Sequence, residues 1–203
     1  MAEPALPPVV DAAFALRGRM LPRDPASALA AALAAQLPWL GDPQQCGIHR
    51  VKLVAGTSAL ALLSQRTRLI LRVPRERLGE LAVLAGASLD VDGQRVQLGA
   101  PQVHELLPHG TLYAPLVASG HADEIAFVAE AGEALARLGV RGRLICGRRG
   151  QVGPASGFSL MIDGLASADS LCVQTHGLGP HRTLGCGVFV AHRSAAALHA
   201  LAA

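Results

Sequence analysis

A glycine-rich segment with a basic centre, residues 177–187, is the clearest chemical feature of the sequence. It contains two Gly-x-Gly pairs with basic residues between them. Glycine lets a backbone approach a ligand closely, and nearby cationic side chains favour an anionic ligand. This combination suits a phosphodiester backbone, although a tight connection between a helix and a strand would also need such glycines. The candidate binding residues of the segment are Gly177, Gly179, His181, Arg182, Gly185 and Gly187.

Histidine is the other residue type that indicates chemistry, because its reference pKa of about 6.5 allows both protonation states near neutral pH. Of the eight histidines, His49 is the only one that precedes residue 104. Lys52, the only lysine of the chain, follows three residues later. A histidine of this kind can act as a general acid or base. A surface histidine at a strand edge is the alternative interpretation of His49.

The composition places the chain among folded globular proteins. Its 203 residues, 51% of them hydrophobic, suffice for one medium domain or two domains of about 100 residues each. The most apolar run near the N-terminus, residues 26–40, contains polar residues and a proline and is too short for a membrane span. The first fifteen residues do not resemble a signal peptide. We therefore expect a cytoplasmic protein with no membrane partner.

The cysteines and the charges limit the possible ligands. The four cysteines are scattered without a Cys-x-x-Cys pair, which disfavours a zinc site and a redox-active dithiol. The glycine-rich segment lacks the Gly-Lys-Ser/Thr ending of a P-loop and the strand-to-helix pattern of a dinucleotide site. We therefore expect neither a metal nor a cofactor. Seventeen arginines and a pI near 8.9 permit an anionic partner without requiring one.

The two halves of the chain repeat one order of elements: strand, helix, strand, strand, helix, strand. Hydrophobic periodicity and turn residues support this order. It predicts an α+β fold of two tandem ferredoxin-like units, with domains at residues 1–105 and 106–203. We expect strands at 9–16, 48–54, 59–64, 68–73, 88–91, 96–98, 112–117, 144–148, 158–162 and 188–191. We expect helices at 25–37, 74–84, 123–138 and 167–175. Strands 59–64 and 68–73 could form a hairpin.

The glycine-rich segment has the form Gly-hydrophobic-Gly, five residues that include Arg182, then Gly-hydrophobic-Gly, before the last predicted strand. In a chain of two ferredoxin-like units, this pattern resembles the Cas6 family of CRISPR-associated endoribonucleases. Segments 47–49, 63–69 and 185–190 resemble its myxan-subtype branch in particular. The resemblance implies metal-independent cleavage of precursor CRISPR RNA within its repeats. In the reaction that the resemblance implies, the ribose 2′-hydroxyl attacks the phosphate and leaves a 2′,3′-cyclic phosphate and a 5′-hydroxyl. The resemblance further implies that the protein retains the mature guide RNA.

The resemblance also implies residue roles. A catalytic histidine in the first half of the chain is typical of the family, which points to His49 as general acid or base. Lys52 and Arg50 are then candidates for stabilising phosphate charge. A regular strand over 48–54 would place His49 and Lys52 on opposite faces, so their convergence requires an irregular backbone after Gly47. The only tyrosine, Tyr113, is distant in sequence, which argues against a tyrosine-assisted site.

Arginines on predicted strands and turns are candidate contacts to RNA phosphates, although each could equally be a solvated charge. The densest group, residues 141–149, lies in and beside the predicted hairpin of the second half. Besides Arg50 and the arginine of the glycine-rich segment, the candidate RNA-binding arginines are Arg17, Arg19, Arg66, Arg68, Arg148 and Arg149.

The implied partners are CRISPR repeat RNA, the mature crRNA and other proteins of a CRISPR effector complex. Some family members only hold RNA, so a weak or inactive repeat-RNA-binding subunit of such a complex is the main alternative function. A small-molecule enzyme that binds a nucleotide phosphate is a third possibility.

Overall fold

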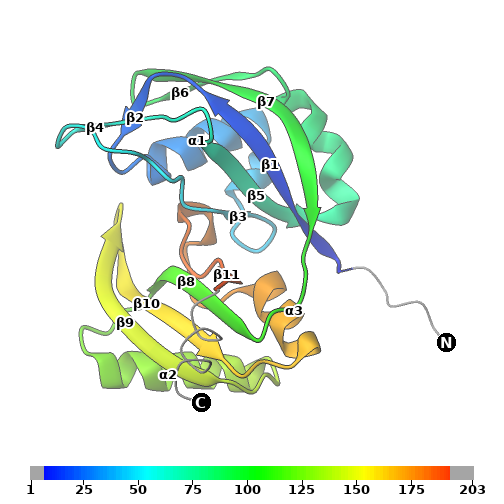
Figure 1. Ribbon diagram of the computed structural model, residues 1–203, viewed down its shortest axis with the longest axis vertical. Helices are drawn as coiled ribbons and strands as arrows, with labels where there is room; N and C mark the ends of the chain where they lie inside the picture. The colour runs from blue at the N-terminus through cyan, green and yellow to red at the C-terminus, as the bar shows by residue number, and fades with distance from the viewer. Residues whose placement is uncertain (1–6, 193–203) are drawn as a thin grey trace, which may run out of the picture. The chain divides into compact units, whose positions relative to one another are not determined.

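The computed structural model describes residues 7–192. The chain divides into two compact units. The first comprises the chain up to Leu106 together with residues 183–185, and the second comprises residues 107–182 and the chain from 186 onward. Each unit has its own hydrophobic core and its own main sheet (Figure 1).

A five-stranded sheet in the order β3-β5-β1-β7-β6 forms the frame of the first unit. Every neighbouring pair in it is antiparallel, and β1 lies at the centre between β5 and β7. The strands are β1 (Val9–Arg17), β3 (Gly47–Ile48), β5 (Arg68–Pro74), β6 (Ser88–Val91) and β7 (Gln94–Glu105).

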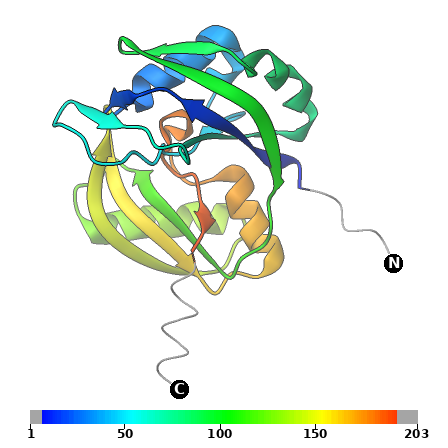
Figure 2. The same cartoon turned by 45° about the horizontal axis from the view of Figure 1, so that its top comes forward.

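The two faces of this sheet differ in chemistry because side chains alternate along each strand. In β1, the even-numbered residues from Val10 to Leu16 are buried in a core with α1 (Ala26–Gln36) and the 3₁₀ helix Arg75–Leu84. Both helices lie on one side of the sheet (Figure 2). Each fully buried Leu, Val or Phe side chain contributes about 1.5–3 kcal/mol to stability. The odd-numbered residues of β1, Asp11 among them, therefore point to the opposite face of the sheet.

The strand predicted at 48–54 is wrong over most of its length. The sheet pairing ends at Ile48, and residues 49–54 have no regular structure. After the His49 N–H donates to the carbonyl of Ile70, at 2.9 Å, the chain leaves β5; farther along, the Val54 N–H donates to the carbonyl of Leu62, at 3.1 Å. The segment that carries the candidate catalytic residues is thus irregular.

The predicted hairpin of 59–64 with 68–73 is also wrong. β4 (Leu60–Leu62) pairs with β2 (Met20–Pro22) in a separate two-stranded sheet, whereas β5 pairs with β1 and β3. Alternating apolar residues identify a strand but not its partner. The segment between β4 and β5 therefore connects two sheets, and its Thr67 N–H donates to the Ser64 carbonyl at 3.0 Å.

The second unit has the four-stranded order β11-β8-β10-β9 of a ferredoxin-like fold. Asp123 caps α2 by accepting a hydrogen bond from the Ala126 N–H at 2.8 Å. The elements are β8 (Thr111–Ala118), α2 (Glu124–Arg137), β9 (Arg143–Val152), β10 (Ala155–Asp163), α3 (Ser167–His176), the 3₁₀ turn Arg182–Leu184 and β11 (Val190–Ala191).

Candidate active site

Three side chains meet on the face of the first sheet that lies opposite the helices. Asp11 of β1 lies directly opposite Arg72 of β5 in the strand register. The Arg72 guanidinium donates from Nε to Asp11 Oδ1 at 2.8 Å and from Nη2 to Oδ2 at 2.9 Å. His49, which follows β3, places its Nε2 atom 3.3 Å from the same Oδ1. Residues from three parts of the sequence thus form one group, which we call the Asp–His–Arg group.

The electrostatics of this group depend on the carboxylate. Burial by itself would raise the pKa of Asp11, but the hydrogen bonds and charges of His49 and Arg72 outweigh burial and hold the pKa well below its usual range. The side chains of Arg72, His49 and Asp11 are only 2%, 11% and 16% exposed. Asp11 is therefore ionised at neutral pH and largely shielded from solvent, where its interactions are strongest.

This lowered pKa predicts a pH dependence of stability. The unfolded value is about 3.9 and the folded value lies below it. The stabilisation is therefore complete above the unfolded pKa and is lost as pH falls through the folded pKa. Asp11→Asn should lower the free energy of unfolding at pH 7 by on the order of 3 kcal/mol. It should also weaken the dependence of that free energy on pH between about pH 4 and pH 2. Urea unfolding at several pH values measures this, and parallel curves for the two proteins would contradict it.

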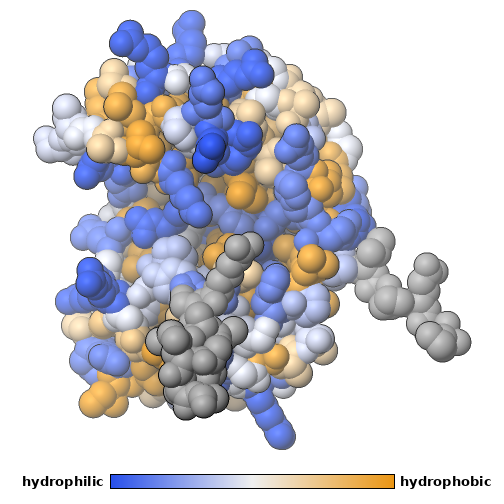
Figure 3. Space-filling view, viewed as in Figure 1, coloured by the Kyte–Doolittle hydropathy of each residue, from blue (hydrophilic) through white to orange (hydrophobic). Residues whose placement is uncertain are grey.

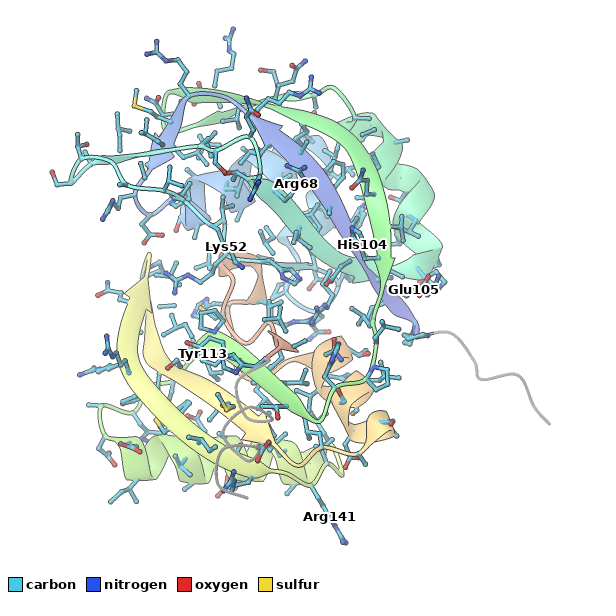
Figure 4. The ribbon with its side chains drawn as sticks, viewed as in Figure 1. Lys52, Arg68, His104, Glu105, Tyr113 and Arg141 are labelled. Atoms are coloured by element: carbon cyan, nitrogen blue, oxygen red, sulfur yellow. The ribbon has the colours of Figure 1, made fainter. Side chains whose placement is uncertain are left out.

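Lys52 and Arg50 lie on the irregular segment beside His49 and are both exposed. The described structure shows no hydrogen bond or ion pair of the Lys52 side chain, so it does not join His49 to Lys52 as a contacting pair. Figure 4 shows Lys52 on the segment after β3, and Arg68 and His104 along the strands of the sheet. Both cations are accessible to an anionic ligand at this position.

The central part of the glycine-rich segment belongs to the first unit. A Cβ atom on Gly185 would lie 2.8 Å from Arg50 Cγ and 3.1 Å from the Ile48 carbonyl oxygen, and its φ is +85°. Glycine is therefore required where the segment packs against the backbone next to His49.

The remaining glycines close the segment on itself. Gly187 has φ +63°, and a Cβ atom there would lie 1.9 Å from the Leu178 carbonyl oxygen. The Leu178 N–H donates to the Gly187 carbonyl at 3.3 Å, and the Gly187 N–H donates to Leu116 at 2.7 Å. Gly177, which ends α3 at φ +66°, and Gly187 are buried, whereas Gly179 is exposed. Gly177 and Gly187 are thus explained by close backbone packing between the end of α3 and the residues before the last strand.

The two basic residues at the centre of the segment differ in their exposure to solvent. Arg182 is buried, and its Nη2 donates to the Thr175 carbonyl near the end of α3 at 3.0 Å. His181 is exposed and has φ +65°, which is uncommon for a residue other than glycine. His181 is therefore the basic residue of the segment that is presented to solvent.

The candidate arginines of the first half gather at one end of the first sheet. Arg68 begins β5 opposite Ala15 of β1, the Leu16 N–H donates to Thr67, and the Leu63 N–H donates to Arg19. Gly18 lies against the backbone of Arg95. Hydrophilic side chains project from the surface at this end (Figure 3). We call these residues the sheet-end arginines; all are exposed, and they are Arg17, Arg19, Arg66, Arg68 and Arg95.

In the second unit, the predicted basic group is partly neutralised. Arg143 pairs with Asp163, with Nη2 2.7 Å from Oδ2. Arg148 and Arg149 are exposed on β9, and Arg141 projects outward from the loop before it (Figure 4). A bulge in the β9–β10 pairing, between Phe158 and Leu160, accompanies these two consecutive arginines.

Other kinds of site have little support in residues 7–192. No group of three or more His, Cys, Asp or Glu side chains there could hold a metal ion. All four cysteines are free thiols. No helix of this part of the chain is long and apolar enough to cross a membrane.

Sequence reasoning missed Asp11 and Arg72. Each interrupts a strand whose neighbouring residues are apolar. One acidic and one basic residue in the middle of two predicted strands is a signal for a buried ion pair. Because the predicted hairpin paired strand 68–73 with 59–64, it did not indicate that β5 pairs with β1 and places Arg72 opposite Asp11.

Comparison with known proteins agrees with the fold. The family model for Cas6, described as "Cas6 Crispr", matches residues 10–194. The CRISPR-associated endonuclease Cas6 of Myxococcus xanthus (strain DK1622) is 40% identical over 186 residues, which are 89% of this chain and 80% of that protein.

Solved structures show the same fold at low sequence identity. One described as "CRISPR associated protein Cas6" has a TM-score of 0.64 and 11% identity, covering 91% of this chain and all of that chain. A Cas6-related protein from Pyrococcus furiosus has a TM-score of 0.60 and 10% identity, covering 92% and 99%. Both support two tandem ferredoxin-like domains. The protein is thus an α+β member of the CRISPR-associated proteins, as its sequence indicates. More specifically, it belongs to the Cas6 family.

Proposed function

We propose that this protein is an endoribonuclease that cleaves precursor CRISPR RNA within its repeats by attack of a ribose 2′-hydroxyl on the adjacent phosphate. The observation that carries the proposal is the Asp–His–Arg group of the first sheet. There, the proton-transfer residue His49 is bonded to the ionised Asp11. The relative from Myxococcus xanthus, itself a CRISPR-associated endonuclease, supports the same reaction class.

The reaction requires two proton transfers. As the bond from the 2′-oxygen to phosphorus forms, a base takes the 2′-hydroxyl proton; as the bond to the 5′-oxygen breaks, an acid supplies a proton to the leaving group. His49 performs one of these transfers. The nucleophile is part of the RNA, so the reaction does not require a metal-bound water.

Arg50 and Lys52 complete the proposed site. The phosphorane gains negative charge, and a cation close to its oxygens lowers the barrier most in a site with little water. Both cations extend from the segment that carries His49. Packing of Gly185 against Arg50 and Ile48 supports this segment. We assign phosphate binding to Arg50 and Lys52, with Lys52 as the catalytic cation.

The sheet-end arginines extend the proposed RNA path within the first unit. Along β5, Arg72 and Arg68 lie on the same face, four residues or about 13 Å apart. This separation would accommodate about two nucleotides of an extended RNA strand between the Asp–His–Arg group and the sheet-end arginines. In the second unit, we assign RNA contacts to Arg148, Arg149 and His181, because all three are exposed.

Replacement of two sheet-end arginines tests this path. Arg17→Ala with Arg19→Ala should reduce the slope of log K against log salt by roughly 1.4–1.8, since each phosphate contact contributes about 0.7–0.9. Filter binding of a repeat RNA at several salt concentrations measures it. Arg137→Ala, which changes an exposed arginine of α2, should leave the slope unchanged. An unaltered slope in the double variant would remove these residues from the path.

The proposed chemistry is tested by cleavage of a repeat RNA in EDTA with analysis of the product ends. We expect a 2′,3′-cyclic phosphate and a 5′-hydroxyl, and no cleavage when the nucleotide 5′ to the cut carries a 2′-deoxy sugar. A requirement for added metal, or a 3′-hydroxyl product, would contradict the mechanism. Binding without any cleavage would instead indicate a repeat-RNA-binding subunit. Persistence of the cleaved RNA on the protein through gel filtration would show that the guide is retained for an effector complex.

A further inference from the structure

We propose that Asp11, held in place by Arg72, is a positioning residue that sets the tautomer and the orientation of the His49 imidazole. The proton exchanged with RNA would then pass through Nδ1 of His49. This inference rests on the proposed function, because it concerns how that site performs proton transfer.

The geometry gives the carboxylate little freedom. Arg72 holds both oxygens of Asp11, at 2.8 and 2.9 Å, and such two-point pairs have a defined orientation. Both residues project from paired strands at the centre of the sheet. The Arg72 side chain is only 2% exposed, so its position is determined by packing. Asp11 therefore presents Oδ1 to the histidine from a rigid support.

The backbone of His49 is also held by a hydrogen bond. Its backbone N–H donates to the carbonyl of Ile70 on β5, at 2.9 Å, at the point where the chain leaves the sheet. The backbone bond places the residue, and the 3.3 Å contact of Nε2 with Asp11 Oδ1 defines the ring orientation. Asp11 thereby supplies the orientation that the irregular segment after Ile48 does not.

The identity of the contacting atom has a chemical consequence. An ionised carboxylate can only accept hydrogen bonds, so Nε2 must carry a hydrogen in both protonation states of the imidazole. In the neutral ring, Nδ1 is then the acceptor nitrogen and the one that can take a proton. The carboxylate also stabilises the positive charge that the ring acquires.

Other basic residues come from the strands and the segment that form this contact. Arg72 approaches from β5, and Arg50 and Lys52 belong to the histidine's own segment. His104 of β7 lies opposite Asp11 in the register. Because Arg72, Arg50 and Lys52 are cations, the Asp11 carboxylate is the residue assigned to stabilising the imidazolium.

Kinetics of an isosteric variant test the role of Asp11. Asp11→Asn should reduce the single-turnover cleavage rate by about 10²–10⁴-fold, with the RNA dissociation constant within twofold of the wild-type value. Asp11→Glu should recover part of the rate. Asp163→Asn is the matched control, because Asp163 also pairs with an arginine, at 2.7 Å, and is 18% exposed. Equal rates for Asp11→Asn and Asp163→Asn would overturn the proposal.

A spectrum of the wild-type protein tests the tautomer without any loss of folding. Correlation spectra of the imidazole nitrogens, assigned with His49→Ala, should show neutral His49 with its hydrogen on Nε2. A hydrogen on Nδ1 would overturn the proposal. The outcomes also separate the two hypotheses: a wild-type protein that does not cleave repeat RNA refutes the proposed function. A protein that cleaves through His49 and is indifferent to Asp11→Asn refutes only this inference.

Discussion

His49→Ala is expected to reduce cleavage of repeat RNA by about 10²–10⁴-fold, the range that a positioned proton-transfer group contributes. The substitution removes the imidazole, the part of the Asp–His–Arg group to which we assign proton transfer. The ion pair of Asp11 with Arg72 remains, so the sheet should keep its structure. RNA affinity should change little because the proposed phosphate contacts lie on arginines and Lys52.

Single-turnover cleavage with saturating protein measures this effect apart from binding. His121→Ala is a suitable control, because His121 is an exposed histidine of the second unit and should leave the rate unchanged. Cleavage by His49→Ala at the wild-type rate would place the chemistry elsewhere. A variant that no longer binds RNA would make His49 a binding residue instead.

Gly187→Ala is expected to lower the free energy of unfolding by roughly 2–5 kcal/mol. A residue with a Cβ atom in the left-handed region costs about 1–2 kcal/mol, and overpacking costs about 1–3 kcal/mol. Here the added atom would lie 1.9 Å from the Leu178 carbonyl oxygen, so the backbone must move. That movement would also disturb the hydrogen bonds of Gly187 with Leu178 and Leu116.

Thermal unfolding measures the loss, which should appear as a fall in Tm of about 5–20 °C for a chain of this length. Gly164→Ala is the matched control: Gly164 has φ +75°, and a Cβ atom there would meet nothing within 4 Å. Gly164→Ala should lower the free energy of unfolding only by the cost of the left-handed conformation. If both variants were equally stable, close packing would not explain the glycine pair.

Residue patterns predict the fold well where each element depends on local chemistry. Helix 123–138 is observed as Glu124–Arg137 because Asp123 caps it and Gly139, with φ +69°, follows it. Pairing between distant strands has no such local signal. The predicted partner of strand 68–73 was its neighbour in sequence, 59–64, whereas the structure pairs β5 with β1 and β3.

The candidate site was predictable in part for the same reason. His49 is identifiable from its residue type and from the family pattern. Its orientation depends on Asp11 and Arg72, which lie 38 and 23 residues away in sequence, and only the sheet register brings them together. The glycine-rich segment differs, because its pattern was recognisable in the sequence but the roles of its residues were not. Its pattern identifies the family, but the structure shows that buried glycines serve close packing, while His181 remains exposed.

The most direct test of the central claim is to sequence the RNA that copurifies with the wild-type protein and with His49→Ala, each expressed with a CRISPR repeat transcript. We predict repeat-derived fragments that end at one defined position with the wild-type protein, and uncut repeat RNA with His49→Ala. RNA without repeat sequence, or the same defined ends with both proteins, would contradict cleavage of CRISPR RNA by His49.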